Sequence, residues 1–215
     1  MRESPATAIL EELFFRYPSL DSIREPILAT FHALVHCFQT GGTLLVCGNG
    51  GSAADCEHIV GELMKTFRIP RPPTNEEQAA LSRAFPEDAP ALIPLLQRGV
   101  PAISLVSQSG LFSAYANDVS AEMVFAQQVF VYGKPGDALL AITTSGASAN
   151  VLTALKVARA KGLTTFLLMG TRCPENTALA DYPICVPEEE TYKVQELHLP
   201  IYHALCAAIE AELYS

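Results

Sequence analysis

The stretch TLLVCGNGGSAAD, residues 43–55, contains the pattern that decides the fold. Residues 43–47 form a short and mostly apolar run, which is typical of a strand buried on both faces of a parallel sheet. The small residues that follow, from Gly48 onward, form a turn that leads at once into a helical pattern. A strand, a glycine-rich turn and a helix in direct succession predict one unit of an α/β fold.

Four more apolar runs of strand length follow along the chain, at residues 102–106, 138–142, 164–169 and 182–186. Helices are predicted around and between these runs. The first begins at Pro5, with Ser4 as its N-cap, and the others cover residues 21–38, 53–65, 111–116, 121–130, 150–160 and 191–214. Strands that alternate with helices predict a five-stranded parallel sheet covered on both faces, with ligands bound at the carboxyl ends of the strands.

Residues 67–99 differ in composition from the rest of the chain, with six prolines among charged residues. Thr74 and Glu77 have the spacing of a capping box, so a short helix to about Ala84 is expected there. We interpret this stretch as an inserted, partly helical segment. The remainder predicts a single domain over residues 1–215 whose first 40 residues are N-terminal helices.

The composition limits the class of protein. A chain of 215 residues that is 49% hydrophobic can bury roughly 70% of its unfolded surface in one core. The formal charge of -9 disfavours a nucleic-acid partner, because affinity for nucleic acids depends on clustered Lys and Arg.

No run approaches the roughly 20 apolar residues of a membrane span, and the first residues do not resemble a signal peptide, so a cytoplasmic protein without a membrane partner is expected. The dispersed cysteines predict reduced thiols, mostly in the core.

A second turn, TTSGASAN at residues 143–150, also lies between a strand and a helix. Its hydroxyls and the N–H groups of the following helix could face one dianionic phosphate, and together with the first turn they predict a phosphate site. An ordinary N-cap is the alternative for such a run taken alone. The first turn also matches the dinucleotide pattern G-x-G-x-x-A, but the next strand ends in Val106-Ser107-Gln108 without the expected acid, which disfavours dinucleotide binding.

Two helices carry titratable side chains at helical spacing. His58 and Glu62 lie four residues apart, with Asp55 on nearly the same face. An exposed ion pair explains such spacing equally well. The closing helix carries a second polar group, which comprises Gln195, Glu196, His198 and His203. If the two helices meet, their nitrogen and oxygen ligands form a plausible first shell for Zn²⁺.

With these motifs in this order, the chain resembles the phosphoheptose isomerase group of the sugar isomerase (SIS) domain family over nearly its whole length, apart from the inserted segment. The resemblance rests on GNGGSAAD at 48–55, His58 and Glu62, Asn117-Asp118, TTSGASAN at 143–150, and Gln195-Glu196 with His203. It implies a three-layer, flavodoxin-like fold. It also implies an aldose–ketose isomerase that interconverts sedoheptulose 7-phosphate and a glycero-manno-heptose 7-phosphate through an enediol, in a cytoplasmic homotetramer with shared active sites and bound Zn²⁺.

The resemblance also implies a role for each matching residue. Glu62 and His203 would be the acid–base pair, and His58, Glu62, Gln195 and His203 would surround the metal. The substrate would be bound by Asn49, Gly50, Gly51, Ser52, Glu62, Asn117, Asp118, Thr143, Thr144, Ser145, Ser148 and Gln195, of which the Thr and Ser residues at 143–148 would hold its phosphate.

Two other functions are compatible with the same sequence. Some SIS-domain proteins of this group bind sugar phosphates without catalysis, including regulators of replication initiation, and they tend to lose the catalytic glutamate. Because Glu62, His58, Gln195 and His203 are all present, the sequence favours an enzyme. An isomerase of a different ketose phosphate is the other alternative.

Overall fold

The computed structural model describes residues 4–215 and contains the predicted parallel sheet. Its strand order is β2-β1-β3-β4-β5, and every neighbouring pair is parallel. The strands are β1 (Leu44–Gly48), β2 (Ala102–Ser104), β3 (Ala138–Thr143), β4 (Thr164–Met169) and β5 (Tyr182–Cys185). This is the flavodoxin-like order, with the switch point between β1 and β3, where ligands bind in such sheets. The fold class is therefore confirmed.

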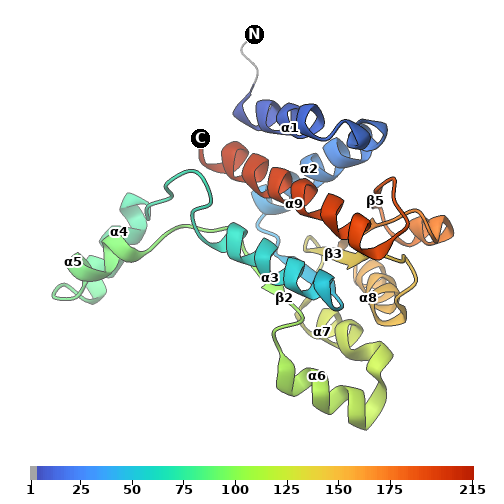
Figure 1. Ribbon diagram of the computed structural model, residues 1–215. Coiled ribbons are helices and arrows are strands. Elements are labelled where there is room, and N and C mark those ends of the chain that lie inside the picture. The colour runs from blue at the N-terminus through green and yellow to red at the C-terminus, as the bar shows by residue number, and fades with distance from the viewer. Residues whose placement is uncertain (1–3) are drawn as a thin grey trace.

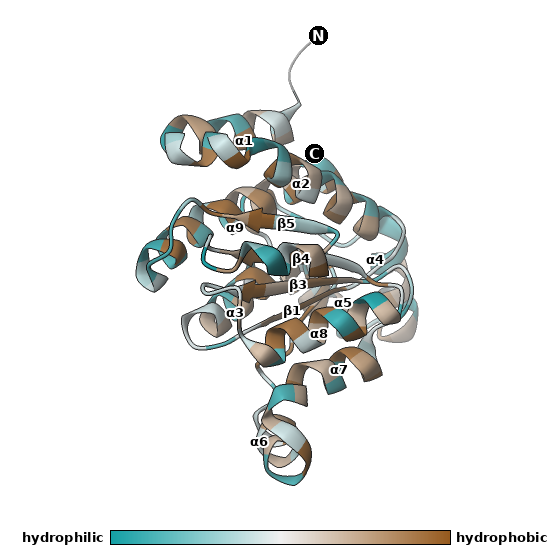
Figure 2. Cartoon of the chain, turned by 90° about the vertical axis from the view of Figure 1, so that its right-hand side faces the viewer, coloured by the Kyte–Doolittle hydropathy of each residue, from teal (hydrophilic) through white to brown (hydrophobic). Residues whose placement is uncertain are grey.

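Helices cover both faces of the sheet (Figures 1 and 2). One layer contains α1 (Pro5–Arg16), α2 (Arg24–Gln39), α3 (Gly51–Met64) and α9 (Thr191–Tyr214), and the other contains α7 (Val124–Tyr132) and α8 (Ala149–Ala160). Alternate residues of each strand supply the two cores: Leu44 and Val46 of β1 belong to the first, and Leu45 and Cys47 to the second. This is the period of two expected for a strand buried on both sides.

Several local predictions are confirmed. The Ser4 hydroxyl accepts a hydrogen bond from the Thr7 N–H at the start of α1, and Thr74 and Glu77 form a complete capping box at the start of α4 (Asn75–Ala84). All six cysteines are free thiols, four of them buried. The remaining short elements are α5 (Ala89–Leu92), α6 (Ser109–Tyr115), the π-helical turn η3 (Ala116–Ser120), and the 3₁₀ turns η1 (Pro18–Ile23), η2 (Ile93–Leu95), η4 (Ala121–Met123) and η5 (Pro174–Leu179).

Some predicted boundaries shift by a few residues. The second strand ends at Ser104 rather than at Val106, because the chain turns there toward α6. The helix after the first glycine turn begins at Gly51, two residues earlier than predicted, so the glycine turn itself supplies the first residues of α3. A helix end has no sequence pattern as strong as its apolar face, which is why these positions are the least predictable.

The inserted segment forms an arm that extends from the body of the molecule (Figure 1). It contains α4, α5 and η2, and α4 has no buried residue. The arm therefore adds almost nothing to the core of its own chain. Among residues 4–215, no helix combines the length and the apolar character needed to cross a bilayer.

The closing helix α9 contains one buried ionisable ring that the site does not use. His198 has no exposed surface, and neither of its ring nitrogens has an aligned hydrogen-bond partner within residues 4–215. Burial lowers the pKa of His198 to about 4, and a contact with the Met169 main chain opposes this shift. The ring is therefore neutral in the folded protein at neutral pH.

This burial makes the stability depend on pH. Because the pKa of His198 is lower in the folded than in the unfolded chain, the unfolded state takes up the proton first as the pH falls. We expect the free energy of unfolding to decrease by on the order of 3 kcal/mol between pH 6.5 and pH 4 from this residue. Urea unfolding across this pH range measures it, and the His198→Leu variant should lack that part of the decrease. Equal pH dependence in both proteins would contradict the assignment.

Candidate active site

The two turns singled out in the sequence meet in one cavity of about 240 Å³. It lies at the carboxyl ends of β1 and β3, where the sheet order reverses. Its lining is polar and almost free of charge, and comprises Asn49, Gly50, Gly51, Ser52, Ile142, Thr143, Thr144, Ser148, Thr191 and Gln195. We call this space the anion cavity.

Three helices begin at the anion cavity. They are α3 after Gly50, α8 after Ser148, and α9 at Thr191, and in none of the three does the side chain of the N-cap residue accept a hydrogen bond from the helix. In α8 the Val151 N–H is bound by the Asn150 side chain, and other first-turn N–H groups remain. Uncapped first-turn N–H groups and the positive ends of the helix dipoles favour an anion, and phosphate binds well to such groups. The cavity can therefore attract a phosphate in a chain of net charge -9, without a lysine or arginine in its lining.

Side-chain hydrogen bonds fix the two turns relative to each other. The amides of Asn49 and Asn150 exchange two hydrogen bonds of 2.8 and 3.0 Å. Thr143 Oγ1 lies 3.0 Å from Ser148 Oγ and 3.5 Å from Ser145 Oγ, so three hydroxyls form one cluster. Gly50 has a φ of 56°, a backbone conformation that favours glycine, and this allows the tight turn into α3.

The helices α3 and α9 bring the predicted titratable residues together. His58 Nε2 lies 3.3 Å from Glu62 Oε1 on its own helix and 3.3 Å from His203 Nε2 on α9. Glu62 is largely buried, and its other oxygen accepts a hydrogen bond of 3.1 Å from the exposed Lys65 ammonium. The two helices meet, and three of the four residues that the resemblance places around a metal lie together.

A hydrogen-bond chain behind His58 fixes the orientation of its ring. The Tyr202 hydroxyl donates to Asp55 Oδ1 at 3.2 Å, and burial together with the Asp55 carboxylate raises the pKa of Tyr202. The hydrogen in the 3.1 Å contact between His58 Nδ1 and Tyr202 therefore belongs to His58. A neutral His58 then presents the lone pair of Nε2 to Glu62 and His203, an arrangement that is favourable only with a proton or a cation between them.

The residues fit a metal by donor type but do not form a finished site. Two imidazoles and one carboxylate are ligands that Zn²⁺ accepts. Within residues 4–215, however, no three His, Cys, Asp or Glu side chains are arranged so that they could hold a metal ion. The fourth predicted ligand, Gln195, lies in the anion cavity, with its amide against Gly51.

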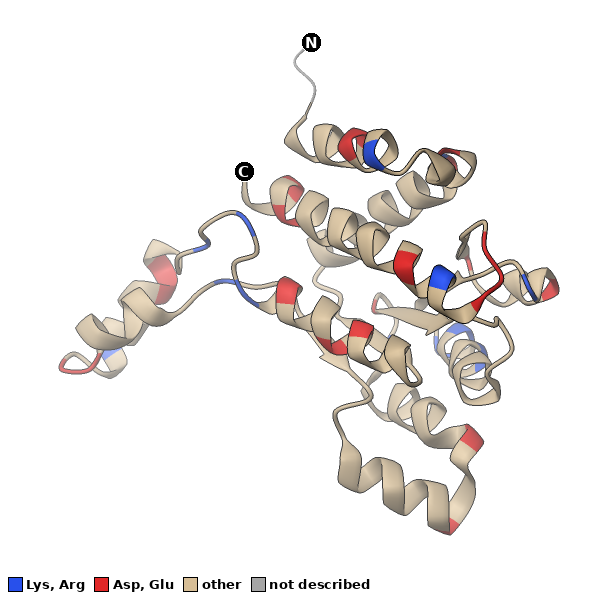
Figure 3. Cartoon of the chain, in the orientation of Figure 1, with Lys and Arg blue, Asp and Glu red and all other residues tan. Residues whose placement is uncertain are grey.

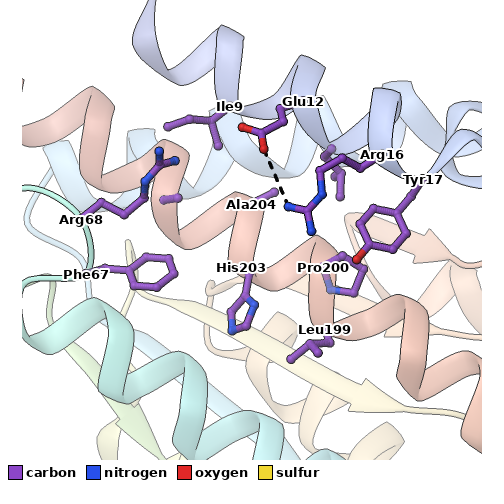
Figure 4. A pocket seen from close by; sticks show the side chains of 12 residues that line it. Ile9, Glu12, Arg16, Tyr17, Phe67, Arg68, Leu199, Pro200, His203 and Ala204 are labelled. Atoms are coloured by element: carbon purple, nitrogen blue, oxygen red, sulfur yellow. Dashed lines mark ion pairs between the residues drawn. The ribbon is translucent and has the colours of Figure 1, made fainter.

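A larger cavity of about 400 Å³ gives access to His203 from the side of α1 (Figure 4). Arg16 and Tyr17 lie on one side of it, and Arg68 and Phe67 lie on the other. Burial lowers the pKa of His203, a protonated His58 would lower it further, and Glu62 opposes both. His203 therefore stays neutral near pH 7, which suits a group that both accepts and donates a proton.

The remaining predicted residues lie apart from these groups. Asn117 and Asp118 are exposed on the π-helical turn after α6, where the Asn117 amide donates to the Asp118 carboxylate, and they line neither cavity of their own chain. Their predicted contact with substrate stays a prediction. His198 lies outside the site because it is buried in the core, and Glu196 lies outside it because its side chain faces solvent.

Four residues of the site were not predicted. They are Tyr202, which orients His58; Asn150, which pairs with Asn49; Thr191, at the start of α9; and Phe67, whose ring centre lies 5.9 Å from that of His203. Asn150 is the last residue of the TTSGASAN turn, and Tyr202 is the neighbour of His203 on the closing helix, where its apolar surroundings indicate a packing residue. A search for hydrogen-bonding side chains next to each motif would have found them.

Comparisons with known proteins agree with this geometry. The family model described as SIS domain matches residues 17–170. A phosphoheptose isomerase from Maridesulfovibrio salexigens is 35% identical over 206 residues, which cover 96% of this chain and 85% of that protein. The structure of a phosphoheptose isomerase from Neisseria gonorrhoeae aligns with a TM-score of 0.72 at 27% identity, covering 94% of this chain and 95% of the other. One from Francisella tularensis aligns at 0.71 and 28%, covering 86% and 85%.

The close fit at Gly51 leads to a test of the anion cavity. A Cβ at this position would lie 2.1 Å from Gln195 Nε2, so Gly51→Ala must displace Gln195 and narrow the cavity. We expect inorganic phosphate to bind roughly tenfold more weakly, measured by isothermal titration calorimetry. The control is Gly61→Ala on the same helix, where a Cβ meets no atom within 4 Å. Unchanged affinity in the Gly51 variant would show that phosphate binds elsewhere.

Proposed function

The chain belongs to the SIS domain family, and from this membership we propose that it is an aldose–ketose isomerase of sugar phosphates that converts sedoheptulose 7-phosphate to a glycero-manno-heptose 7-phosphate. One observation carries the proposal: Glu62 and His203 both contact His58, and the same two helices, α3 and α9, begin at the anion cavity. A phosphate held by the helix N-termini would therefore be attached to a sugar that extends toward an acid–base pair.

The reaction requires a base and a group that moves protons between oxygens. A proton leaves C1 of the ketose, an enediol forms, and the proton is returned to C2. The carbonyl double bond shifts from C2 to C1 as the C1 hydroxyl loses its proton and the C2 oxygen gains one. Glu62 would carry the carbon-bound proton, because its carboxylate is largely buried and is held between His58 and Lys65. His203 would exchange protons at the oxygens, because its ring is neutral near pH 7.

The anion cavity would orient the substrate for this transfer. N–H groups from three helices and hydroxyls from residues 143–148 can bind a terminal phosphate without excluding the sugar hydroxyls from solvent. Binding energy gained at the phosphate places C1 and C2 near the pair, which reduces the entropy lost in reaching the transition state.

A divalent metal fits this proposal. His58, Glu62 and His203 would hold Zn²⁺, and Gln195 would join them if its side chain turns from the anion cavity. Bound Zn²⁺ would polarise the substrate carbonyl as a Lewis acid. The 3.3 Å contact of His58 Nε2 with the Glu62 carboxylate supports a cation or a proton at this point, because a lone pair on His58 facing the carboxylate would be repelled. The cytoplasmic location implied by the resemblance stays a prediction.

The Glu62→Gln variant tests the catalytic assignment. Glutamine keeps the shape but cannot take up the proton, so we expect turnover of sedoheptulose 7-phosphate to fall by a factor of about 100 to 10,000, with phosphate binding retained. Formation of the aldose product is followed by chromatography, with zinc in the buffer. The control is Glu57→Gln, an exposed glutamate on the same helix whose partner is Ser107.

Either of two outcomes would contradict the proposal. Equal turnover in the Glu62 variant and the wild type would remove this carboxylate from the mechanism. If the wild-type protein converts neither sedoheptulose 7-phosphate nor another ketose phosphate but binds a second protein tightly, it is a non-catalytic binding protein.

Native mass spectrometry of the purified protein tests the metal and the assembly together. We expect four chains per particle with one Zn²⁺ per chain. Exposed apolar side chains support association, since Phe15 is 86% exposed and Val131 is 65% exposed. The His58→Ala variant should keep the four chains and lose the metal. A particle of one chain would overturn the proposed assembly of four chains. Unchanged metal content in the His58→Ala variant would overturn the proposed zinc site.

A further inference from the structure

A buried ion pair lies directly behind the proposed acid–base pair. The side chain of Arg71 is fully buried and that of Glu210 is 3% exposed, and Arg71 Nε lies 3.1 Å from Glu210 Oε1. The Nε–H is not aligned for a hydrogen bond, so this contact is electrostatic. Burying two charges is costly unless their remaining donors and acceptors are also satisfied. The other hydrogen bonds of Arg71 and Glu210 therefore show which parts of the chain the pair holds in place.

These other contacts reach the main chain on both sides of the pair. Arg71 donates to the main-chain oxygens of Leu63 at 3.0 Å and Glu62 at 3.3 Å. Both carbonyls lie in the last turn of α3, where no further helical N–H is available to them. A guanidinium at this end also complements the negative end of the helix dipole. Arg71 therefore fixes the turn of α3 that carries Glu62.

Glu210 fixes the segment that follows α3. Its carboxylate accepts hydrogen bonds from three consecutive main-chain N–H groups, those of Phe67 at 2.9 Å, Arg68 at 2.7 Å and Ile69 at 3.1 Å. Phe67 contacts His203 on α9, the same helix that carries Glu210. The ion pair thus connects the segment bearing Glu62 to the helix bearing His203.

The arm beyond this pair is closed at its base by other contacts. Arg98 N–H donates to the Arg71 carbonyl at 2.7 Å, and Arg98 Nε donates to the Pro72 carbonyl at 3.0 Å. The Arg98 guanidinium lies 5.1 Å from the Tyr214 ring centre, on the same ring that Arg71 approaches at 5.0 Å. Arg98 therefore resembles Arg71 in its aromatic contact, but it is only partly buried, and the side-chain hydrogen bond it makes goes to the base of the arm rather than to α3.

We propose that Arg71, held by Glu210, is a positioning residue for the isomerase, and this inference rests on the proposed function. Its guanidinium sets the end of α3 so that the Glu62 carboxylate faces His58 and His203. The substrate phosphate binds at the opposite end of α3, which begins at Gly51. Loss of the Arg71 contacts should therefore slow turnover without weakening substrate binding.

The test measures kcat and KM separately in three variants. Arg71→Lys keeps the charge but cannot reach Glu210, Leu63 and Glu62 together with one ammonium group. We expect kcat to fall tenfold to a hundredfold, because a displacement of about 1 Å is enough for such a loss, with KM changed by less than twofold. Arg98→Lys is the matched control and should keep the wild-type kcat.

A double variant separates an effect on the position of Glu62 from an effect on stability. Arg71→Met combined with Glu210→Gln removes both charges, so no uncompensated charge remains buried. The new amide oxygen can still accept from the Arg68 and Ile69 N–H groups, while the Phe67 N–H loses its acceptor. We expect this double variant to be folded at the assay temperature, as measured by circular dichroism. Its kcat should fall by the same factor as that of Arg71→Lys.

The outcomes distinguish this inference from the proposed function. If the wild type has no isomerase activity, the proposed function fails. If the wild type is active and the Arg71 variants keep its kcat, or lose it only as far as they unfold, Arg71 does not position Glu62. An equal loss in Arg98→Lys would show that any change at the base of the arm has this effect, and would overturn the inference as well.

Discussion

The packing of α9 against α3 on one face of the sheet is the constraint on which the site depends. Both helices start at the switch point between β1 and β3, so their N-termini share the anion cavity, and their side-by-side path brings His58 to His203. A parallel sheet places such helix starts at one edge, because every strand ends there. The proposed anion site and the proposed acid–base pair are thus two results of a single packing arrangement.

The same arrangement of helices determines how the molecule can attract an anion. The chain has a net charge of -9, and its Lys and Arg residues are spread over several elements rather than gathered in one patch (Figure 3). An anionic ligand therefore depends on oriented main-chain dipoles, which are present only where uncapped helices begin. Near the other end of α3, buried charges are paired or hydrogen-bonded, as Arg71 with Glu210 and Glu62 with His58 and Lys65.

The inserted segment shows how a fold of this kind accepts an addition. It leaves the body after α3 and returns before β2, and main-chain hydrogen bonds such as Arg98 N–H to the Arg71 carbonyl close its base. The arm itself has few buried side chains, since only Ala89 of α4 and α5 is buried. A long connection closed at its base costs little in loop entropy, so the sheet and site keep their geometry.

The sequence by itself determined the sheet, the two turns of small residues between a strand and a helix, and the helical face of His58 and Glu62, because each depends on short-range periodicity or on the special backbone of glycine. Only the tertiary structure decided which polar residues of α9 join them. His198 and His203 are five residues apart on one helix, yet one is buried in the core and the other reaches His58. The rotation of α9 about its axis selects between them, and that rotation is fixed by packing against α3 and the sheet, which no local pattern encodes. The same holds for Tyr202, Arg71 and Glu210, whose partners lie between 8 and 147 residues away along the chain.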